Sequence, residues 1–160
     1  MSTIRPFRPD DAEAMLGLHG EAITRCCAAT LSPEAVTAWL SGRTPEGYLR
    51  AIAKGERFWV ATGADNAVIG FASWRDDELE SLYVHPDHQG SGVGRALFAA
   101  CEKDARACEQ SLTKVSSTLN AQSFYESLGF HFISTGYWEK RGHRLPTIEM
   151  IRPAKTLHEG

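Results

Sequence analysis

The sequence lacks any apolar run close to the roughly 20 residues that a transmembrane helix needs. Its first residues, Met1 to Pro6, also lack the apolar stretch of a signal peptide. We therefore expect a cytoplasmic protein that has no membrane partner. The 160 residues, 42% hydrophobic and 23% charged, predict one globular domain over residues 1–160 with a loose tail over 153–160.

Patterns typical of metal sites and of nucleic-acid-binding surfaces are missing as well. The four cysteines form no CxxC pair and have no metal-ligand spacing with histidine, so we expect no metal site. Cys101 and Cys108 fall on the apolar face of an expected helix and are predicted to lie in the core. The net charge of −3, without a basic stripe, predicts no nucleic-acid partner and favours small partners.

The most informative stretch covers residues 79–97 and reads LESLYVHPDHQGSGVGRAL. Its first half is rich in apolar residues and stops at Pro86, which predicts a strand over 78–84. Its last part begins a helix, expected over about 92–109. Glycines occupy alternate positions where this helix begins, at Gly90, Gly92 and Gly94. Without Cβ atoms, the free N–H groups of the helix start can approach a ligand closely.

The charge pattern predicts that this helix start binds an anion. Arg95 is in the first turn, and no acidic residue follows before Glu102. The alternative is that the glycines form only a flexible turn and Arg95 is a solvated surface charge. A P-loop is excluded because Arg95 and Ala96 follow Gly94, and a dinucleotide fingerprint would need glycine in place of Arg95.

This motif resembles the signature of the GNAT superfamily of N-acetyltransferases. That signature is Gln or Arg, two residues, Gly, one residue, and Gly or Ala, entered from a strand that ends in Val-x-Pro. The resemblance implies acetyl-coenzyme A as cosubstrate. It also implies that the pyrophosphate lies on the backbone of Gln89, Gly90, Ser91, Gly92, Val93, Gly94 and Arg95. The pantetheine arm is expected along Leu82, Tyr83 and Val84, with the N–H of Val84 polarising the acetyl carbonyl.

A second stretch, residues 120–130, reads NAQSFYESLGF and resembles another GNAT signature. It predicts a short helix that begins at Asn120 and ends at Gly129. Asn120 is expected to cap this helix, to contact the cofactor arm, or both.

The fold class predicted is α/β (α+β). The resemblance implies the GNAT fold, a mixed sheet of about six to seven strands, about four to five helices and a splayed parallel pair of strands at the cofactor site. Residue patterns predict strands over 3–7, 57–62, 68–74, 78–84, 112–117, 130–133 and 145–151, with helices over about 11–24, 33–40, 45–55, 92–109 and 120–128. The strand over 112–117 follows a helix crossover, so it should lie parallel to the strand over 78–84. Residues 136–144 are expected to be a polar connection.

Tyr125 is the candidate general acid. Aminolysis of a thioester requires a proton donor for the leaving thiolate, and a phenol is protonated at neutral pH. The family places its acid at this tyrosine. The alternative is an ordinary core tyrosine.

Glu80 is the candidate general base. It shares strand parity with Glu78, Leu82 and Val84, so both carboxylates could face the acceptor amine. A solvated strand face is the alternative, and His85 and His131 are weaker candidates.

The sequence thus predicts an N-acetyltransferase that transfers the acetyl group of acetyl-coenzyme A to a primary amine by direct attack. A non-catalytic acyl-coenzyme A sensor is the alternative. The acceptor, a small amine or a peptide N-terminus, and the choice between monomer and homodimer stay open. Trp39, Tyr48 and residues 26–30 could line the acceptor site, or the two aromatics could be core. No role follows from the sequence for Cys26, Cys27, Trp74, Trp138 or His143.

Overall fold

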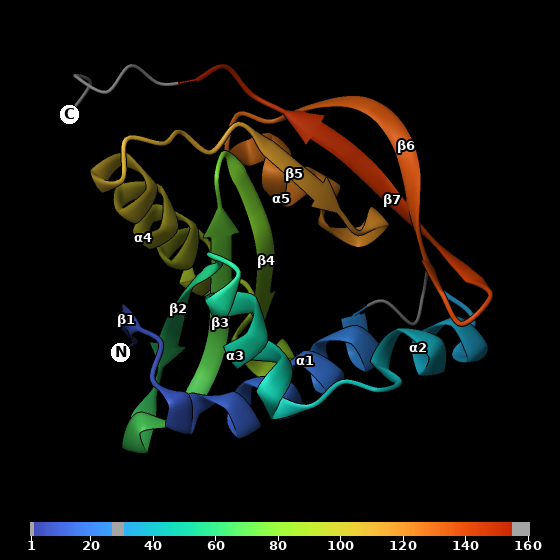
Figure 1. The fold of residues 1–160 in the computed structure, drawn as a ribbon, viewed down its shortest axis with the longest axis horizontal. Helices are drawn as coiled ribbons and strands as arrows, with labels where there is room; N and C mark the ends of the chain where they lie inside the picture. The colour runs from blue at the N-terminus through green and yellow to red at the C-terminus, as the bar shows by residue number, and fades with distance from the viewer. Residues whose placement is uncertain (1, 27–30, 155–160) are drawn as a thin grey trace.

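The computed structural model describes residues 2–26 and 31–154. Its strands form a seven-stranded sheet in the order β1-β2-β3-β4-β5-β7-β6 (Figure 1). The strands are β1 (Thr3–Pro6), β2 (Arg57–Thr62), β3 (Val68–Arg75), β4 (Glu78–Val84), β5 (Lys114–Ser117), β6 (His131–Lys140) and β7 (His143–Ile151). The α-helices of the described residues are α1 (Ala12–Cys26), α2 (Pro33–Leu40), α3 (Pro45–Ala53), α4 (Val93–Ala107) and α5 (Gln122–Ser127).

The sheet is mixed, as predicted. Strands β1 to β4 pair antiparallel in chain order, β4 and β5 pair parallel, and β7 joins β5 to β6 in antiparallel fashion. The parallel pair and the crossover through α4 confirm the topology expected from the strand-helix-strand pattern. No helix of the described residues has the length and apolar character required to cross a bilayer.

Helices pack on both faces of the sheet, because successive side chains of β2 and β3 point to opposite faces and both sets are apolar. Phe58, Val60 and Phe71 pack with residues of α1 and α3 in one core cluster. Ala61 and Ala72, each next in sequence to a residue of that cluster, point to the opposite face and pack with α4 in the main cluster. Side chains of a strand alternate between faces, so this pattern follows from the sequence.

The apolar face of α4 supplies the centre of the main core. Leu97 and Cys101 are fully buried there, as the helical spacing predicts. Cys108 is exposed, so its predicted core position is wrong. The helix ends at Ala107 and Cys108 is its C-cap, where the chain leaves the sheet and the helical periodicity no longer applies.

Two local predictions near α5 and β5 also need correction. Asn120 is not the cap of α5, because it lies inside a short 3₁₀ turn, Leu119–Ala121. Ala121 is the capping residue, and no side chain caps that helix end. Strand β5 begins at Lys114 rather than at Leu112, which is fully buried.

The last hairpin is much longer than predicted. Residues 136–144, expected to be a polar connection, are mostly strand, and the turn is only Arg141 and Gly142. Both turn residues have positive φ, 49° and 80°, the conformation of tight hairpin turns that twist with their strands. The hairpin therefore extends beyond the sheet toward α2, as Figure 1 shows.

One half-buried carboxylate ties α4 to the sheet. Asp104 on α4 accepts hydrogen bonds from the indole N–H groups of Trp59 and Trp74, both at 3.0 Å, and from Arg57 at 2.8 Å. Burial alone would raise the pKa of Asp104, but these hydrogen bonds outweigh burial and lower it.

We predict that Asp104→Asn lowers the free energy of unfolding at pH 7 by about 1–3 kcal/mol, since the charge-assisted hydrogen bonds are weakened. A depressed pKa stabilises the fold above the unfolded value of about 3.9 and loses this contribution as the pH falls through the folded pKa. Urea unfolding from pH 7 to pH 3 measures both effects. Asp10→Asn, an exposed change, is the control, and equal acid sensitivity of Asp104→Asn and wild type would contradict this role.

Candidate active site

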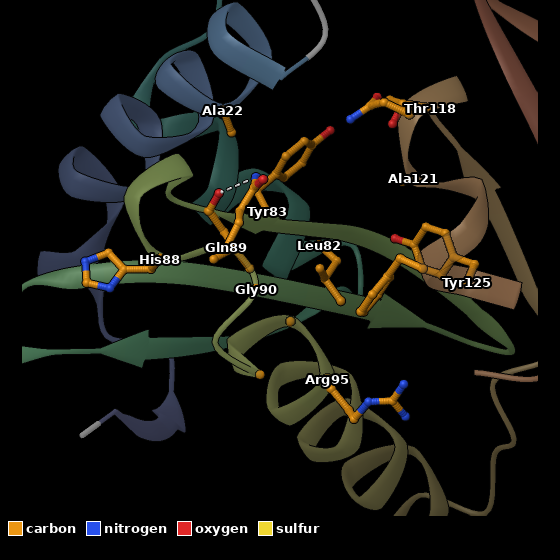
Figure 2. A pocket seen from close by; sticks show the side chains of 15 residues that line it. Ala22, Leu82, Tyr83, His88, Gln89, Gly90, Arg95, Thr118, Ala121 and Tyr125 are labelled. Atoms are coloured by element: carbon orange, nitrogen blue, oxygen red, sulfur yellow. Dashed lines mark hydrogen bonds between the residues drawn. The ribbon is translucent and has the colours of Figure 1, made fainter. Parts of the chain in front are cut away.

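A cavity of about 420 Å³ lies where β4 ends, between the first turn of α4 and α5 (Figure 2). The predicted residues that line it are Leu82, Tyr83, Val84, Gln89, Gly90, Gly92, Gly94, Arg95, Asn120 and Tyr125. Ser91 and Val93, also predicted to bind the cofactor, do not line it with their side chains. Val93 is buried in the core, and the hydroxyl of Ser91 donates to the carbonyl of His88 at 2.5 Å.

The cavity is open because the parallel ladder between β4 and β5 is short. Glu78 pairs with Lys114 and Leu79 with Val115, and the strands then diverge. On its other edge β4 has a register shift: Trp74 of β3 faces Leu79, whereas Ser73 faces Ser81. Glu80 is thus the extra residue of a β-bulge, which bends a strand and increases its twist.

Backbone polarity along β4 follows from its pairing with β3. The N–H of His85 donates to the carbonyl of Ile69 at 2.8 Å. Hydrogen-bonded and non-hydrogen-bonded pairs alternate along an antiparallel ladder, so the N–H groups of Val84 and Leu82 turn away from β3. They face the gap left by β5, where an extended ligand can hydrogen-bond to them.

The glycine turn presents backbone N–H groups to the same cavity. Gly90 and Gly92 have φ of 79° and 87°, values that favour glycine. At Gly94 a Cβ atom would lie 3.3 Å from the ring of Phe124, so a side chain there would push against α5. The first backbone hydrogen bond of α4 joins the Ala96 N–H to the Gly92 carbonyl, so the N–H groups before Ala96 are available to an anion.

Two polar side chains of the turn are already engaged. The Gln89 amide donates to the Val84 carbonyl at 3.3 Å (Figure 2). Arg95 donates to the hydroxyl of Ser127 at 3.0 Å, so its guanidinium is held toward α5. Arg95 still lines the cavity, and its exposed charge favours an anionic ligand.

Tyr125 lies where the cavity narrows. Only 5% of its surface is exposed, and Phe124 and Phe130 pack edge-on against its ring at 5.2 and 5.9 Å. Burial, and then the nearby Tyr83 and Cys101, raise the pKa of its phenol, so the group is protonated at neutral pH. Within the described residues its hydroxyl has no hydrogen-bond partner, and Figure 2 shows it pointing toward the side of Leu82.

A second cavity of about 480 Å³ lies on the other side of β4, under the end of the long hairpin. Its aromatic lining includes Trp39, Tyr48, Phe58, Phe71, Tyr83 and Trp138. Trp39 and Tyr48 are also buried in core clusters, so each residue both lines this cavity and packs in the core. Residues 27–30 lie outside the described residues.

A small third cavity shares lining residues with each of the other two. Tyr125, Leu82 and Tyr83 line the first and the third, while Glu80 and Trp138 line the second and the third. Tyr83 borders all three. Tyr125 and Glu80 thus both line the third cavity, which we call the passage between the two larger ones.

Glu80 belongs to a carboxylate pair that the sequence did not indicate. Burial first, and then the charge of Glu56, raises the pKa of Glu80, although Arg75 lies 3.4 Å away. Glu56 accepts from the hydroxyl of Ser73 at 2.5 Å, and burial raises its pKa too. Glu56 precedes β2 and meets β4 only through pairing across β3, so no local pattern could reveal it.

The predicted strand parity of Glu80 with Leu82 and Val84 is wrong. The bulge at Glu80 shifts the alternation, so that Leu82 and Val84 pack with Leu79 on the main core, whereas Glu80 lines the second and third cavities. Glu78 lines none of the three cavities. The weaker base candidates, His85 and His131, line none of the three cavities either. His85 accepts from the backbone N–H of Asp87, and His131 is exposed on β6.

His19 forms the floor of the second cavity with Tyr48. It is 4% exposed, its Nδ1 lies 3.3 Å from the Tyr48 hydroxyl, and its Nε2 has no partner among the described residues. Burial, followed by the charges of Arg43 and Lys140, lowers its pKa to about 3, so it is neutral at physiological pH. Among the described residues, no cluster of three or more potential metal-ligating His, Cys, Asp or Glu residues occurs.

The family that this architecture indicates is found independently by comparison. Residues 27–151 match the family model "Acetyltransferase (GNAT) domain". The L-amino acid N-acyltransferase MnaT of Escherichia coli is 30% identical over 141 residues, which cover 80% of this chain and 78% of the relative.

Solved structures agree. A GCN5-related N-acetyltransferase from Rhodopseudomonas palustris aligns with a TM-score of 0.84 and 28% identity, covering 95% of each chain. A PaiA N-acetyltransferase from Thermoplasma acidophilum, solved with coenzyme A, shares the fold with a TM-score of 0.74 and 21% identity over 96% of this chain and 99% of its own. The glycine turn, the splayed strands and these matches together show that the chain belongs to the GNAT family of acetyltransferases.

Proposed function

We propose that the protein transfers the acetyl group of acetyl-coenzyme A to the primary amine of a small molecule, with Tyr125 as general acid and Glu80 as general base. The observation that carries this proposal is the passage between the two larger cavities, which Tyr83 borders. Two candidate groups line it, the protonated phenol of Tyr125 and the carboxylate of Glu80, whose pKa is raised.

The first cavity fits the cosubstrate. The pyrophosphate would lie on the N–H groups of the turn from Gln89 to Arg95, and the pantetheine amides would pair with the free edge of β4 at Leu82 and Val84. This arrangement brings the thioester to the passage. The coenzyme A bound to the Thermoplasma relative supports the same ligand here.

Direct attack moves two protons. The neutral amine attacks the acetyl carbon, the C–S bond breaks, and the products are the N-acetylated acceptor and coenzyme A thiol. Tyr125 would donate a proton to the sulfur as the thiolate forms. The raised pKa of the phenol keeps the proton on Tyr125 until the thiolate develops.

Glu80 would accept the proton that the acceptor nitrogen releases. A general base works best when its pKa lies near the operating pH. The pKa of Glu80 is raised, so it lies closer to neutral pH than that of an exposed glutamate. Glu56 lines the same cavity and reinforces this shift. A coenzyme A sensor would need neither carboxylate, which favours catalysis.

A small acceptor is supported by the limited size and aromatic lining of the second cavity and by the name of the Escherichia coli relative, an L-amino acid N-acyltransferase. Acetyl-coenzyme A should raise the melting temperature even without an acceptor. A ligand that binds only the native state, at a concentration a hundredfold above its Kd, stabilises that state by about 2.7 kcal/mol.

We predict that Gly92→Asp abolishes this thermal shift, because it places a negative charge beside the pyrophosphate. Gly92→Asn is the matched control. Asparagine tolerates the same left-handed backbone and has nearly the same shape, so it should retain more of the shift. Differential scanning fluorimetry with coenzyme A and acetyl-coenzyme A makes the measurement. A full shift in Gly92→Asp would remove the anion site from the proposal.

We predict that Tyr125→Phe lowers kcat and kcat/KM together by about 10²–10⁴, with KM for acetyl-coenzyme A nearly unchanged, because the lost interaction exists mainly in the transition state. Tyr137→Phe, an exposed tyrosine on β6, is the control. Steady-state release of coenzyme A thiol measures both. Wild-type kcat in Tyr125→Phe would exclude the phenol as the acid.

We predict that Glu80→Gln lowers kcat/KM at neutral pH by about a hundredfold or more, with a smaller loss at high pH, where the acceptor is already a free amine. Glu78→Gln is the control: Glu78 lies two residues earlier on the same strand and lines none of the cavities, although its charge interacts with that of Glu80, so this change should lower kcat/KM far less. If kcat/KM of Glu80→Gln and of wild type depended on pH in the same way, Glu80 would be a solvated surface residue and not the base.

A further inference from the structure

The second cavity is lined by side chains of both charges. Glu80 lines both this cavity and the passage, and the charge of Glu56, another lining residue, acts on it. Arg43 and Arg50 line the same cavity from the α2–α3 connection and α3. An acceptor whose amine reaches the thioester beside Glu80 could therefore contact these arginines with another part of its structure.

Arg43 is oriented but not neutralised. Its Nε donates to the Trp39 carbonyl at 3.0 Å, and it is half-buried. Across residues 2–26 and 31–154, no carboxylate forms an ion pair with Arg43 or with Lys140 and Arg141 at the tip of the β6–β7 hairpin.

The positive charge of Arg43 affects the pKa values of two neighbouring groups. The charge of Arg43 lowers the pKa of Lys140, after burial, and contributes to the depressed pKa of His19. The hairpin tip is held against the α2–α3 connection, since a Cβ on Gly42 would lie 3.4 Å from the guanidinium of Arg141. The cations of the hairpin tip therefore lie close to Arg43, and the charge of Lys140 acts on His19 in the cavity lining.

We infer that Arg43, supported by Lys140, binds a carboxylate of the acceptor, so that the acceptor is an amino carboxylate whose amine lies at Glu80. This inference rests on the proposed acetyl transfer and names its substrate class. A planar guanidinium with free N–H groups suits a carboxylate. A polyamine would place a second cation against Arg43, and a peptide amide would leave its charge unpaired.

Part of the cavity lining suits an apolar side chain. Trp39 and Trp138 meet edge-on with their ring centroids 5.4 Å apart, and Tyr48 packs against Phe58 and Phe71. These rings give the cavity an aromatic surface. Methionine, leucine and phenylalanine match this environment better than glutamate or lysine.

The test compares each of L-methionine, L-leucine and L-phenylalanine with its primary amide, by kcat/KM for thiol release. The amide has the less basic amine and so more of the reactive neutral form, which means that a preference for the acid cannot arise from amine basicity. We expect the acid to be preferred by about tenfold to a hundredfold, the range of one charged hydrogen-bonded contact.

Variants then identify the residues that cause the preference for the acid over the amide. In Arg43→Gln the acid-to-amide ratio should fall toward one, mainly through a higher KM for the acid, and Arg43→Lys should restore part of it. Lys140→Gln should change the ratio in the same direction by less. Arg144→Gln is the matched control, because it removes one positive charge from the same hairpin at an exposed site stacked on Tyr137.

Amides or simple amines acetylated as well as the acids, or a ratio unchanged in Arg43→Gln, would overturn the inference while leaving acetyl transfer intact. Absence of thiol release with every amine, despite binding of acetyl-coenzyme A, would overturn the proposed function together with it. Thermal stabilisation by the amino acids in the presence of coenzyme A gives a readout without turnover, and it should be lost in Arg43→Gln.

Discussion

The parallel ladder of β4 and β5 joins only Glu78 with Lys114 and Leu79 with Val115, and the site depends on its brevity. The Glu80 bulge follows immediately and turns the rest of β4 away from β5. This divergence opens the sheet for a ligand, frees the backbone of β4 and creates a passage between its two faces. A full ladder would have satisfied those backbone groups within the protein and closed the passage.

Burial acts on the polar groups of the molecule in different ways. Asp104 is half-buried, accepts four hydrogen bonds from three residues and has a lowered pKa, which suits a structural link. Tyr125 and Glu80 are partly or fully buried without enough partners, and their pKa values are raised. The difference lies in the number of hydrogen bonds available to the charged form. Groups that stabilise the fold are saturated, whereas the proposed catalytic groups have unused bonding capacity.

Local patterns revealed the parts of the site that are contiguous in sequence. The glycine turn, α4 and the segment with Tyr125 could be placed because each depends on spacing within about twenty residues. Glu56, Arg43 and Trp138 could not, since the fold brings them to β4 from elements far away in the chain. Asn120 and Cys108 were misassigned because a 3₁₀ turn and a helix end interrupted the expected periodicity.

The long β6–β7 hairpin separates two tasks within one small fold. It contributes Trp138 to the second cavity and brings Lys140 and Arg141 close to Arg43, whereas none of its residues lines the first cavity. Changes in the length or composition of the hairpin tip can therefore alter which molecules enter without disturbing cofactor binding. The sequence of the hairpin tip could therefore vary among relatives while the cofactor site stays the same. Exchanging residues 137–144 between relatives would be a direct way to change acceptor selectivity.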